Sequence, residues 1–292
     1  MKILYYDCFC GICGDMHLAA LLDLGVPKEH LLCELSRLNL ESKYQIKIEQ
    51  SEKQGIRGTR VDVLISEEKS EENGTHRNLK DIENIINSSN LNENIKKISL
   101  KIFMKVAEAE ATVHGKTIYQ VNFEKAGAID SIVDIVGAAI CIDYFKVDKI
   151  ISSKVQLGGG YIKCVHGIMP VPTPATIEIL KGIPIKTGLV DFETTTPTGA
   201  AILAANVEKF SSSINFKIKK TGYGIGHRDL VIPNVLRVYL GEKNNNDEIE
   251  DKCMIEIDIK DLTPDYFKYV EGELYKVGSL DKKNNLKLKM SN

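Results

Sequence analysis

The first 25 residues place a glycine-rich turn between a buried strand and a helix, and this arrangement constrains the fold more than any other feature. Residues 2–6 are mostly apolar or aromatic, as in a short buried strand. The turn CFCGICG follows, and DMHLAALLDL predicts a helix that ends at Gly25. Asp15 suits the start of that helix, as a cap and through the helix dipole. The pattern predicts an α/β protein, with a mixed α+β fold as the alternative.

The chain beyond this unit contains both strand-like and helical patterns. Residues 79–114 have helical periodicity, and a further helix is expected from about Ile129. The glycine-containing segment TGYGIGHRD predicts a loop between two strands. Strand-like patterns occupy residues 44–49, 59–65, 215–220 and 235–240.

A polar stretch near the C-terminus predicts a domain boundary. The segment KNNNDEIED contains charged and amide side chains and few groups that could enter a core, which is typical of a linker. We therefore expect a main domain at residues 1–243, a linker at 244–251 and the start of a C-terminal α+β unit at 252–292. About 40 residues are few for an independent core, so we expect this unit to be incomplete.

Composition argues against several classes of protein. The formal net charge is −2 over 292 residues, which does not favour a nucleic-acid binder. No apolar run is long enough to cross a bilayer, and the N-terminus does not resemble a signal peptide. The seven cysteines are therefore expected in the cytoplasm, where a disulfide framework is rare.

Glycines and carboxylates in the N-terminal turn predict a binding site. Gly11 and Gly14 would let backbone N–H groups approach an anion at the helix N-terminus. Asp7 and Asp15 could hold a divalent cation beside that anion, or act directly in catalysis. The alternative is a tight turn in which Asp15 only caps the helix.

Three thiols occur within six residues of the same turn. Thiolates are soft ligands that suit Zn²⁺, Cu⁺ or Ni²⁺. No second pair of cysteines with metal-site spacing completes an ordinary zinc site, so buried inert cysteines are the alternative. The candidate metal ligands are Cys8, Cys10 and Cys13.

Two aspartates on one predicted helix form a second candidate site. Asp130 and Asp134 are four residues apart and therefore share one helix face. Like charges held together are unfavourable unless a cation or a backbone group compensates, so the pair predicts a cation site, with Asp130 as a catalytic candidate. A helix capped at Asp130, with Asp134 in solvent, is the alternative.

Glycines and one histidine mark a third segment. Gly159 is the middle of three consecutive glycines, which indicate a close approach of backbone or ligand. His166 follows and could ligate a transition metal, although a lone histidine is more often a packed or surface residue.

Two further segments could bind a phosphate or carboxylate. Thr196 and Thr198 precede a predicted helix and offer hydroxyls beside free N–H groups. Gly224 lies in the glycine loop, and Arg228 after it could pair with phosphate. A simple hairpin turn explains the glycine loop equally well.

These motifs, in this order, resemble the LarC-type nickel insertion family. The matching segments cover almost all of residues 1–241, and together they are highly specific. They are DCFCGICGDM, AEAEATVHG, GAIDSIVDIVGAA, HGIMPVPTPAT, TPTGAA and GYGIGHRD with PNVLRV.

The resemblance implies a nickel chelatase of the lyase class. Such proteins insert Ni²⁺ into pyridinium-3,5-bisthiocarboxylic acid mononucleotide, the pincer cofactor of lactate racemase, using CTP hydrolysis assisted by Mn²⁺ or Mg²⁺. The implied partners are the mononucleotide precursor, the lactate racemase apoprotein or other maturation proteins, and a second copy of the chain.

The sequence departs from the usual family pattern in three places. Residues 122–127 read NFEKAG where the family usually reads HFHEVG, and Cys10 and Cys13 replace two usual serines. The chain also ends at Asn292, near where the family continues. Two alternatives therefore stand beside the chelatase: a nickel-carrying subunit whose catalytic half is a separate chain, and a repurposed paralogue that binds a phosphate ligand.

Overall fold

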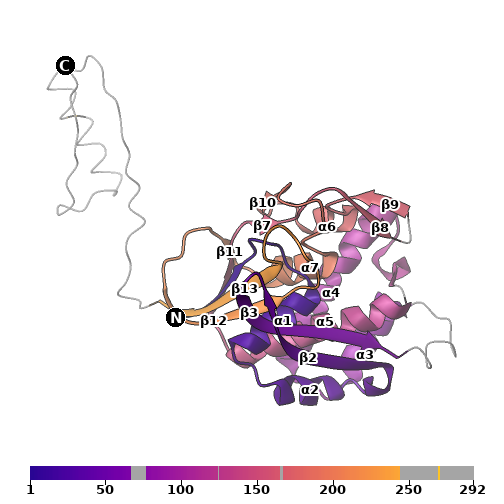
Figure 1. Ribbon diagram of the computed structural model, residues 1–292. Coiled ribbons are helices and arrows are strands. Elements are labelled where there is room, and N and C mark those ends of the chain that lie inside the picture. The colour runs from indigo at the N-terminus through magenta and orange to yellow at the C-terminus, as the bar shows by residue number, and fades with distance from the viewer. Residues whose placement is uncertain (67–76, 124, 165–166, 244–268, 270–292) are drawn as a thin grey trace. The chain divides into compact units, whose positions relative to one another are not determined.

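A computed structural model describes residues 1–66, 77–123, 125–164, 167–243 and 269 (Figure 1). The chain divides into two compact units, Met1–Asn245 and Asn246–Asn292. The expected linker and nearly all of the expected C-terminal unit lie outside the described residues.

A seven-stranded mixed sheet forms the centre of the first unit, in the order β11–β6–β1–β13–β12–β3–β2. β1 is parallel to β6 and antiparallel to β13, while β12 is antiparallel to β13 and parallel to β3. The strands are β1 (Lys2–Asp7), β2 (Tyr44–Lys53), β3 (Ile56–Ile65), β6 (Lys149–Ser152), β11 (Lys209–Phe210), β12 (Lys217–Ile225) and β13 (Val235–Glu242).

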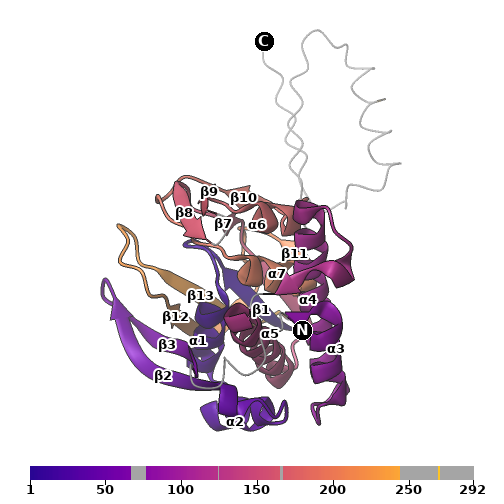
Figure 2. The same cartoon turned by 90° about the vertical axis from the view of Figure 1, so that its right-hand side faces the viewer.

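Helices cover one face of the sheet. Figure 2 shows α1 against the strands, α5 behind it and α4 beyond α5, in agreement with the packing of these elements. The helices are α1 (Gly14–Leu24), α2 (Lys28–Ser36), α3 (Leu79–Ser88), α4 (Glu93–His114), α5 (Lys125–Phe145), α6 (Pro174–Ile179) and α7 (Pro197–Asn206). None of these described helices has the length and apolar character that a bilayer crossing requires.

Short strand pairs complete the unit. β10 (Ile185–Lys186) lies parallel to β7 (Val155–Gln156), next to the carboxyl end of β6. The other pairs are β4 (Arg77–Asn78) with β5 (Asn122–Phe123), and β8 (Tyr161–Cys164) with β9 (Gly167–Pro170). Two 3-10 turns span Glu41–Lys43 and Ile118–Gln120.

The predicted α/β class and the predicted strand–turn–helix unit are confirmed. Gly25 ends α1 with a φ of 125°, and its N–H donates to the last carbonyls of the helix. The N-cap of α1 is Cys13, however, and Asp15 lies in the first turn. The helical stretch at residues 79–114 is two helices, because Ser89 and Asn92 interrupt it with extended backbone.

The prediction of a glycine loop at TGYGIGHRD was wrong, because most of this segment belongs to strand β12. Its glycines let α1 pack directly on the strand. A Cβ atom at Gly222 would overlap the carbonyl oxygen of Ala20, and one at Gly224 would overlap that of Met16. The glycines are therefore explained by helix–sheet packing, a reason that local sequence patterns do not reveal.

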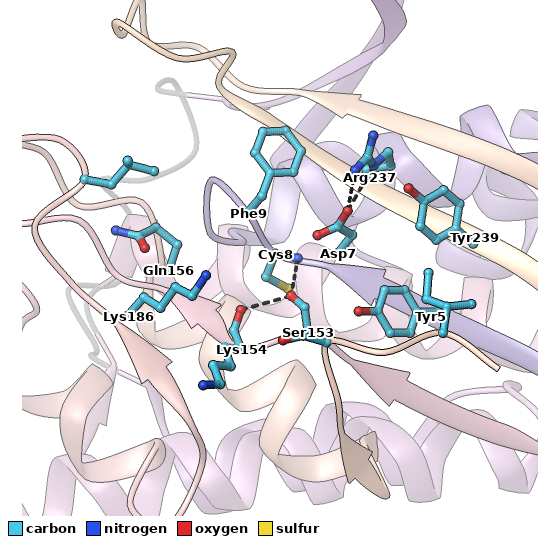
Figure 3. Close-up of a pocket in the computed structure, with 13 residues that line it drawn as sticks. Tyr5, Asp7, Cys8, Phe9, Ser153, Lys154, Gln156, Lys186, Arg237 and Tyr239 are labelled. Carbon is cyan, nitrogen blue, oxygen red and sulfur yellow. Dashed lines mark hydrogen bonds and ion pairs between the residues drawn. The ribbon is translucent and has the colours of Figure 1, made fainter. Parts of the chain in front are cut away.

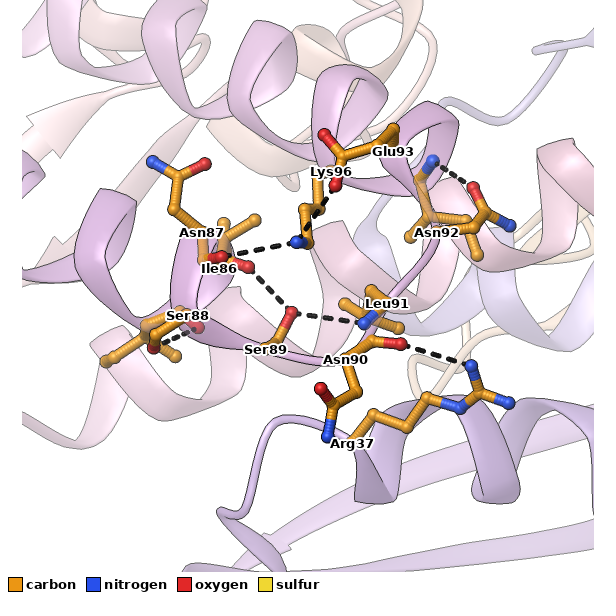
Figure 4. A network of polar contacts seen from close by, with 12 residues as sticks. Arg37, Ile86, Asn87, Ser88, Ser89, Asn90, Leu91, Asn92, Glu93 and Lys96 are labelled. Carbon is orange, nitrogen blue, oxygen red and sulfur yellow. Dashed lines mark hydrogen bonds and ion pairs between the residues drawn. The ribbon is translucent and has the colours of Figure 1, made fainter.

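A polar network holds the connection between α3 and α4 (Figure 4). Arg37, at the end of α2, donates to the carbonyl of Asn90 over 3.1 Å. The Asn92 side chain accepts from the N–H of Ile95 over 2.9 Å and donates to Asp143 on α5 over 3.2 Å. This one side chain both starts α4 and attaches it to α5.

We expect Asn92→Ala to lower the free energy of unfolding by about 1–2 kcal/mol, because it removes a helix cap. Asn90→Ala is the matched control, since Asn90 is exposed and its contact with Arg37 uses the backbone. The control should stay within about 0.5 kcal/mol of the unchanged protein. Urea unfolding measures both, and equal losses in the two variants would contradict the assignment.

Candidate functional site

The turn between β1 and α1 (residues 8–13, called the Cys turn below) contacts two segments that are distant from it in sequence. The N–H of Cys8 donates to Ser153 Oγ over 3.0 Å, and the N–H of Ile12 donates to Thr195 Oγ1 over 3.3 Å. Ile12 and Thr195 also form an isolated β-bridge. The turn is therefore fixed from both sides, with an acidic cluster after it and a cavity before it.

The acidic cluster begins with Asp15, in the first turn of α1. His227 Nε2 lies 2.9 Å from Asp15 Oδ2 and 3.3 Å from Asp62 Oδ1. Arg60 Nη2 lies 2.7 Å from His227 Nδ1, and since an arginine only donates, Nδ1 accepts and Nε2–H points to the carboxylates. The hydrogen bond to Asp15 raises the pKa of His227, whereas burial and Arg60 act to lower it.

Two further carboxylates reach this cluster from α5. Burial and the neighbouring Asp15 raise the pKa of Asp130 to about 6. Asp134 is buried against the start of α1, where its carboxylate fills the space that a side chain at Gly14 would need. Its Oδ1 atom has no hydrogen-bond partner, and burial followed by repulsion from Asp130 and Asp15 raises its pKa well above the usual value.

Cys13 completes the cluster. Its thiol hydrogen-bonds the Asp15 carboxylate, and burial together with that negative charge raises its pKa well above the usual value. Burial alone would raise the pKa of Asp15, but the hydrogen bonds from His227 and Cys13 outweigh it, and the pKa of Asp15 is lowered. The cluster thus combines an ionised carboxylate, two carboxyls that resist ionisation, a thiol and an imidazole.

The cavity lies at the other end of the Cys turn, beside the carboxyl ends of β1 and β6, and has a volume of about 390 Å³ (Figure 3). Arg237 closes one side, where its guanidinium binds Asp7 Oδ2 through Nε at 3.0 Å and Nη2 at 2.6 Å. The cavity is lined by Tyr5, Asp7, Cys8, Phe9, Ser153, Lys154, Gln156, Lys186, Leu189, Ser212, Ile214, Arg237 and Tyr239.

The three predicted thiol ligands do not converge. Cys8 Sγ lies 3.6 Å from Ser152 Oγ and Cys10 Sγ lies 3.9 Å from Asn234 Oδ1, whereas Cys13 faces Asp15. Burial raises the pKa of Cys8 to about 12 and that of Cys10 to about 11. Within the described ranges, no three His, Cys, Asp or Glu side chains already surround one metal position.

The predicted carboxylates separate into two sites. Asp15, Asp130 and Asp134 come together, while Asp7 binds Arg237 in the cavity. The alternative of a helix capped at Asp130 was wrong, because α5 begins at Lys125 and Asp130 lies inside it.

Most predicted anion-binding residues have structural partners. Gly11 has a φ of 80°, and a Cβ there would overlap the carbonyl oxygen of Thr194. The Thr196 hydroxyl caps α7 by accepting from the N–H of Gly199, and Thr198 lies in the first turn of that helix. The N–H of Gly159 donates to the carbonyl of Phe192, and the Arg228 guanidinium lies over the Phe192 ring. His166 lies outside the described residues.

Sequence reasoning missed several residues that the fold brings to these sites. His227 and Asp62 join the acidic cluster from segments far from the Cys turn in sequence. Gln156, Lys154 and Lys186 line the cavity without belonging to a recognisable motif. The only sequence signal was indirect: the three consecutive glycines that follow β7 predicted a close approach of backbone or ligand.

Comparison with known proteins agrees with these motifs. A family model described as "Nickel insertion protein" matches residues 4–283. The chain belongs to this nickel insertion family. It is 64% identical over 288 residues to a pyridinium-3,5-bisthiocarboxylic acid mononucleotide nickel insertion protein of Clostridium kluyveri, covering 96% of this chain and 72% of the relative.

Other members of the nickel insertion family match a similar length of this chain. Proteins with the same name from Clostridium acetobutylicum and Acetivibrio thermocellus are 60% and 46% identical. Each match covers 96% of this chain, and 74% and 70% of the respective relative. No solved structure matches the chain. The resemblance to the nickel insertion family is thus confirmed.

The raised pKa of Asp130 predicts a pH-dependent stability for the metal-free nickel insertion fold. The folded state holds this proton up to about pH 6, whereas the ordinary aspartate pKa is 3.8. The free energy of unfolding should therefore fall as pH rises between these two values. Asp130→Asn cannot ionise, so its stability relative to the unchanged protein should grow across this window and level off above about pH 6.

The control for this prediction is Asp143→Asn, on the same helix. Burial acts to raise the pKa of Asp143, but hydrogen bonds from Lys146 and Asn94 outweigh it and lower the pKa. Its carboxylate therefore stabilises the fold once ionised, and the stability of the Asn variant relative to the unchanged protein should fall as pH rises through the acidic range. Urea unfolding from pH 3.5 to 7.5 measures both trends. Parallel trends for the two variants would contradict the assignment.

Proposed function

We propose that this chain inserts nickel into pyridinium-3,5-bisthiocarboxylic acid mononucleotide, as the names of its relatives state for those proteins. The acidic cluster beside the Cys turn would receive the metal. The observation that carries this assignment is the buried Oδ1 atom of Asp134, which has no hydrogen-bond partner and lies near the carboxylates of Asp130 and Asp15. A buried carboxylate oxygen without a partner is costly, and a cation would satisfy it.

The donor set suits a metal that must be delivered. Nickel binds imidazole and thiolate well, and the cluster offers His227 and Cys13 beside its carboxylates. Burial and neighbouring negative charges raise the pKa values of Cys13 and Asp134, so nickel binding would have to act against this resistance to ionisation and release any proton they hold. Because ionising these groups costs free energy, the site binds nickel less tightly than a site whose same ligands are already ionised. Such a site can pass the metal to the stronger sulfur and carbon ligands of the pincer.

The remaining features of the proposal come from the family resemblance. CTP with Mn²⁺ or Mg²⁺ would drive the insertion, as a chelatase of the lyase class. The loaded cofactor would pass to the lactate racemase apoprotein in the cytoplasm, and the chain would act as a homo-oligomer.

We expect Asp134→Asn to weaken nickel binding at least roughly tenfold, the scale of losses seen when a group supporting a metal site is removed. The metal-free variant should at the same time unfold at a higher temperature at neutral pH, because an amide cannot ionise, whereas burial and repulsion from Asp130 and Asp15 make the ionised form of Asp134 unfavourable in the folded state. Isothermal titration with Ni²⁺ and thermal unfolding without metal measure the two effects. A structural role for Asp134 would instead lower the unfolding temperature.

Asp143→Asn is the matched control, because it makes the same substitution on α5 outside the cluster. It should bind nickel as the unchanged protein does. Activity is then measured with the full chain, sulfurated precursor, Ni²⁺, Mn²⁺ and CTP, and the product is identified by mass spectrometry. Nickel-loaded product that is lost in Asp134→Asn supports the proposal. Absence of product from the unchanged chain would overturn it.

A further inference from the structure

The cavity beside the Cys turn has a positive balance of charge. Its lining contains three basic side chains, Lys154, Lys186 and Arg237, against the single carboxylate of Asp7. Asp7 is already bound to Arg237, and neither lysine forms an ion pair with another described residue. Two ammonium groups therefore remain for an anionic ligand.

Gln156 adds a buried hydrogen-bond donor to the same wall. It is 3% exposed and lines the cavity, yet its Nε2 has no hydrogen-bond partner. Its backbone is fixed, because the carbonyl accepts from the hydroxyls of Thr194 and Thr195 over 2.9 and 2.6 Å. In the β7–β10 pair, Gln156 stands opposite Lys186. A buried amide without a partner indicates a missing acceptor.

Aromatic rings line the opposite wall. The Arg237 guanidinium lies 5.5 Å from the centre of the Phe9 ring and 5.4 Å from that of Tyr239. Tyr239 in turn stacks on Tyr5 at 5.9 Å. In Figure 3, these rings and Arg237 lie on one side of Cys8, and Lys154, Lys186 and Gln156 lie on the other. One wall suits an aromatic ring that carries anionic groups, because Arg237 lies beside its rings, and the other suits an anion.

We propose that this cavity binds the pyridinium mononucleotide that receives the nickel, with its phosphate at Lys154, Lys186 and Gln156 and its ring against Phe9 and the tyrosines. This inference rests on the proposed function. The volume of about 390 Å³ falls within the range of roughly 300–1000 Å³ typical of small-ligand sites. The substrate carries a phosphate and two thiocarboxylates, which match the excess of basic groups.

The position of the cavity also fits metal transfer. Cys8 and Phe9 line it at the start of the Cys turn, and Cys13 joins the acidic cluster at the end of the same turn. The two sites are thus joined by six consecutive residues. Ligand and metal can occupy separate regions of opposite charge and meet across this turn.

The test is a binding measurement without nickel, using nicotinic acid mononucleotide as the probe because it has a pyridinium ring, a carboxylate and a ribose phosphate. Isothermal titration with the full chain compares the unchanged protein, Lys154→Glu/Lys186→Glu and Gln156→Leu. We expect the dissociation constant to rise at least roughly tenfold in the double variant, because charge-assisted hydrogen bonds to phosphate are lost. Gln156→Leu should raise it several-fold.

Lys97→Glu/Lys101→Glu is the matched control, since it makes the same change of charge at exposed positions of α4. It should bind the probe as the unchanged protein does, and circular dichroism confirms that every variant folds. Unchanged binding in both cavity variants would overturn the inference. Equal affinity for inorganic phosphate alone would also overturn it, as would displacement of the probe by CTP, which would make the cavity a triphosphate site.

The nickel insertion assay separates this inference from the proposed function. If the unchanged chain loads nickel but the cavity variants keep the same KM for the precursor, the cavity assignment fails and the function stands. If the chain loads no nickel but binds the probe through Lys154, Lys186 and Gln156, the function fails and the cavity stands as a pyridinium mononucleotide site.

Discussion

The close packing of α1 between the sheet and α5 determines where both candidate sites lie. On the sheet side, Gly222 and Gly224 leave no side chain between β12 and the backbone of α1. On the other side, Gly14 gives its space to Asp134, and Gly137 allows Leu18 to pack against α5. Because the helix cannot move away from either neighbour, the turn that precedes it is held in one place. A larger residue at any of these glycines would displace that turn.

This packing also keeps two groups of opposite charge apart instead of letting them pair with each other. The Cys turn separates a group of carboxylates around the start of α1 from a group of basic side chains around the end of β1. Each group keeps its own partners: His227 and Cys13 on the acidic side, Asp7 with Arg237 on the basic side. A metal cation and an anionic organic ligand can therefore be attracted to different places before they react.

Local patterns in the sequence predicted the strand–turn–helix unit, the pair Asp130 and Asp134, and the start of α7, because each depends on neighbours a few residues away. They failed for Gly224, because the helix that packs on it, α1, lies about two hundred residues earlier in the chain. They also could not find His227 or Gln156, which reach their sites through the sheet order and the β7–β10 pair. Three neighbouring cysteines suggested one metal site, but the turn directs their side chains to different partners.

The dependence of the Cys turn on distant segments has a consequence during synthesis. The cysteines leave the ribosome well before Ser153, Thr195 and His227, which are needed to hold the turn and complete the acidic cluster. Contacts of such long sequence separation form late in folding. The nascent chain therefore carries its thiols long before the surroundings that keep them protonated are in place. During that interval these thiols are more exposed to metal ions and oxidants than they are in the folded protein.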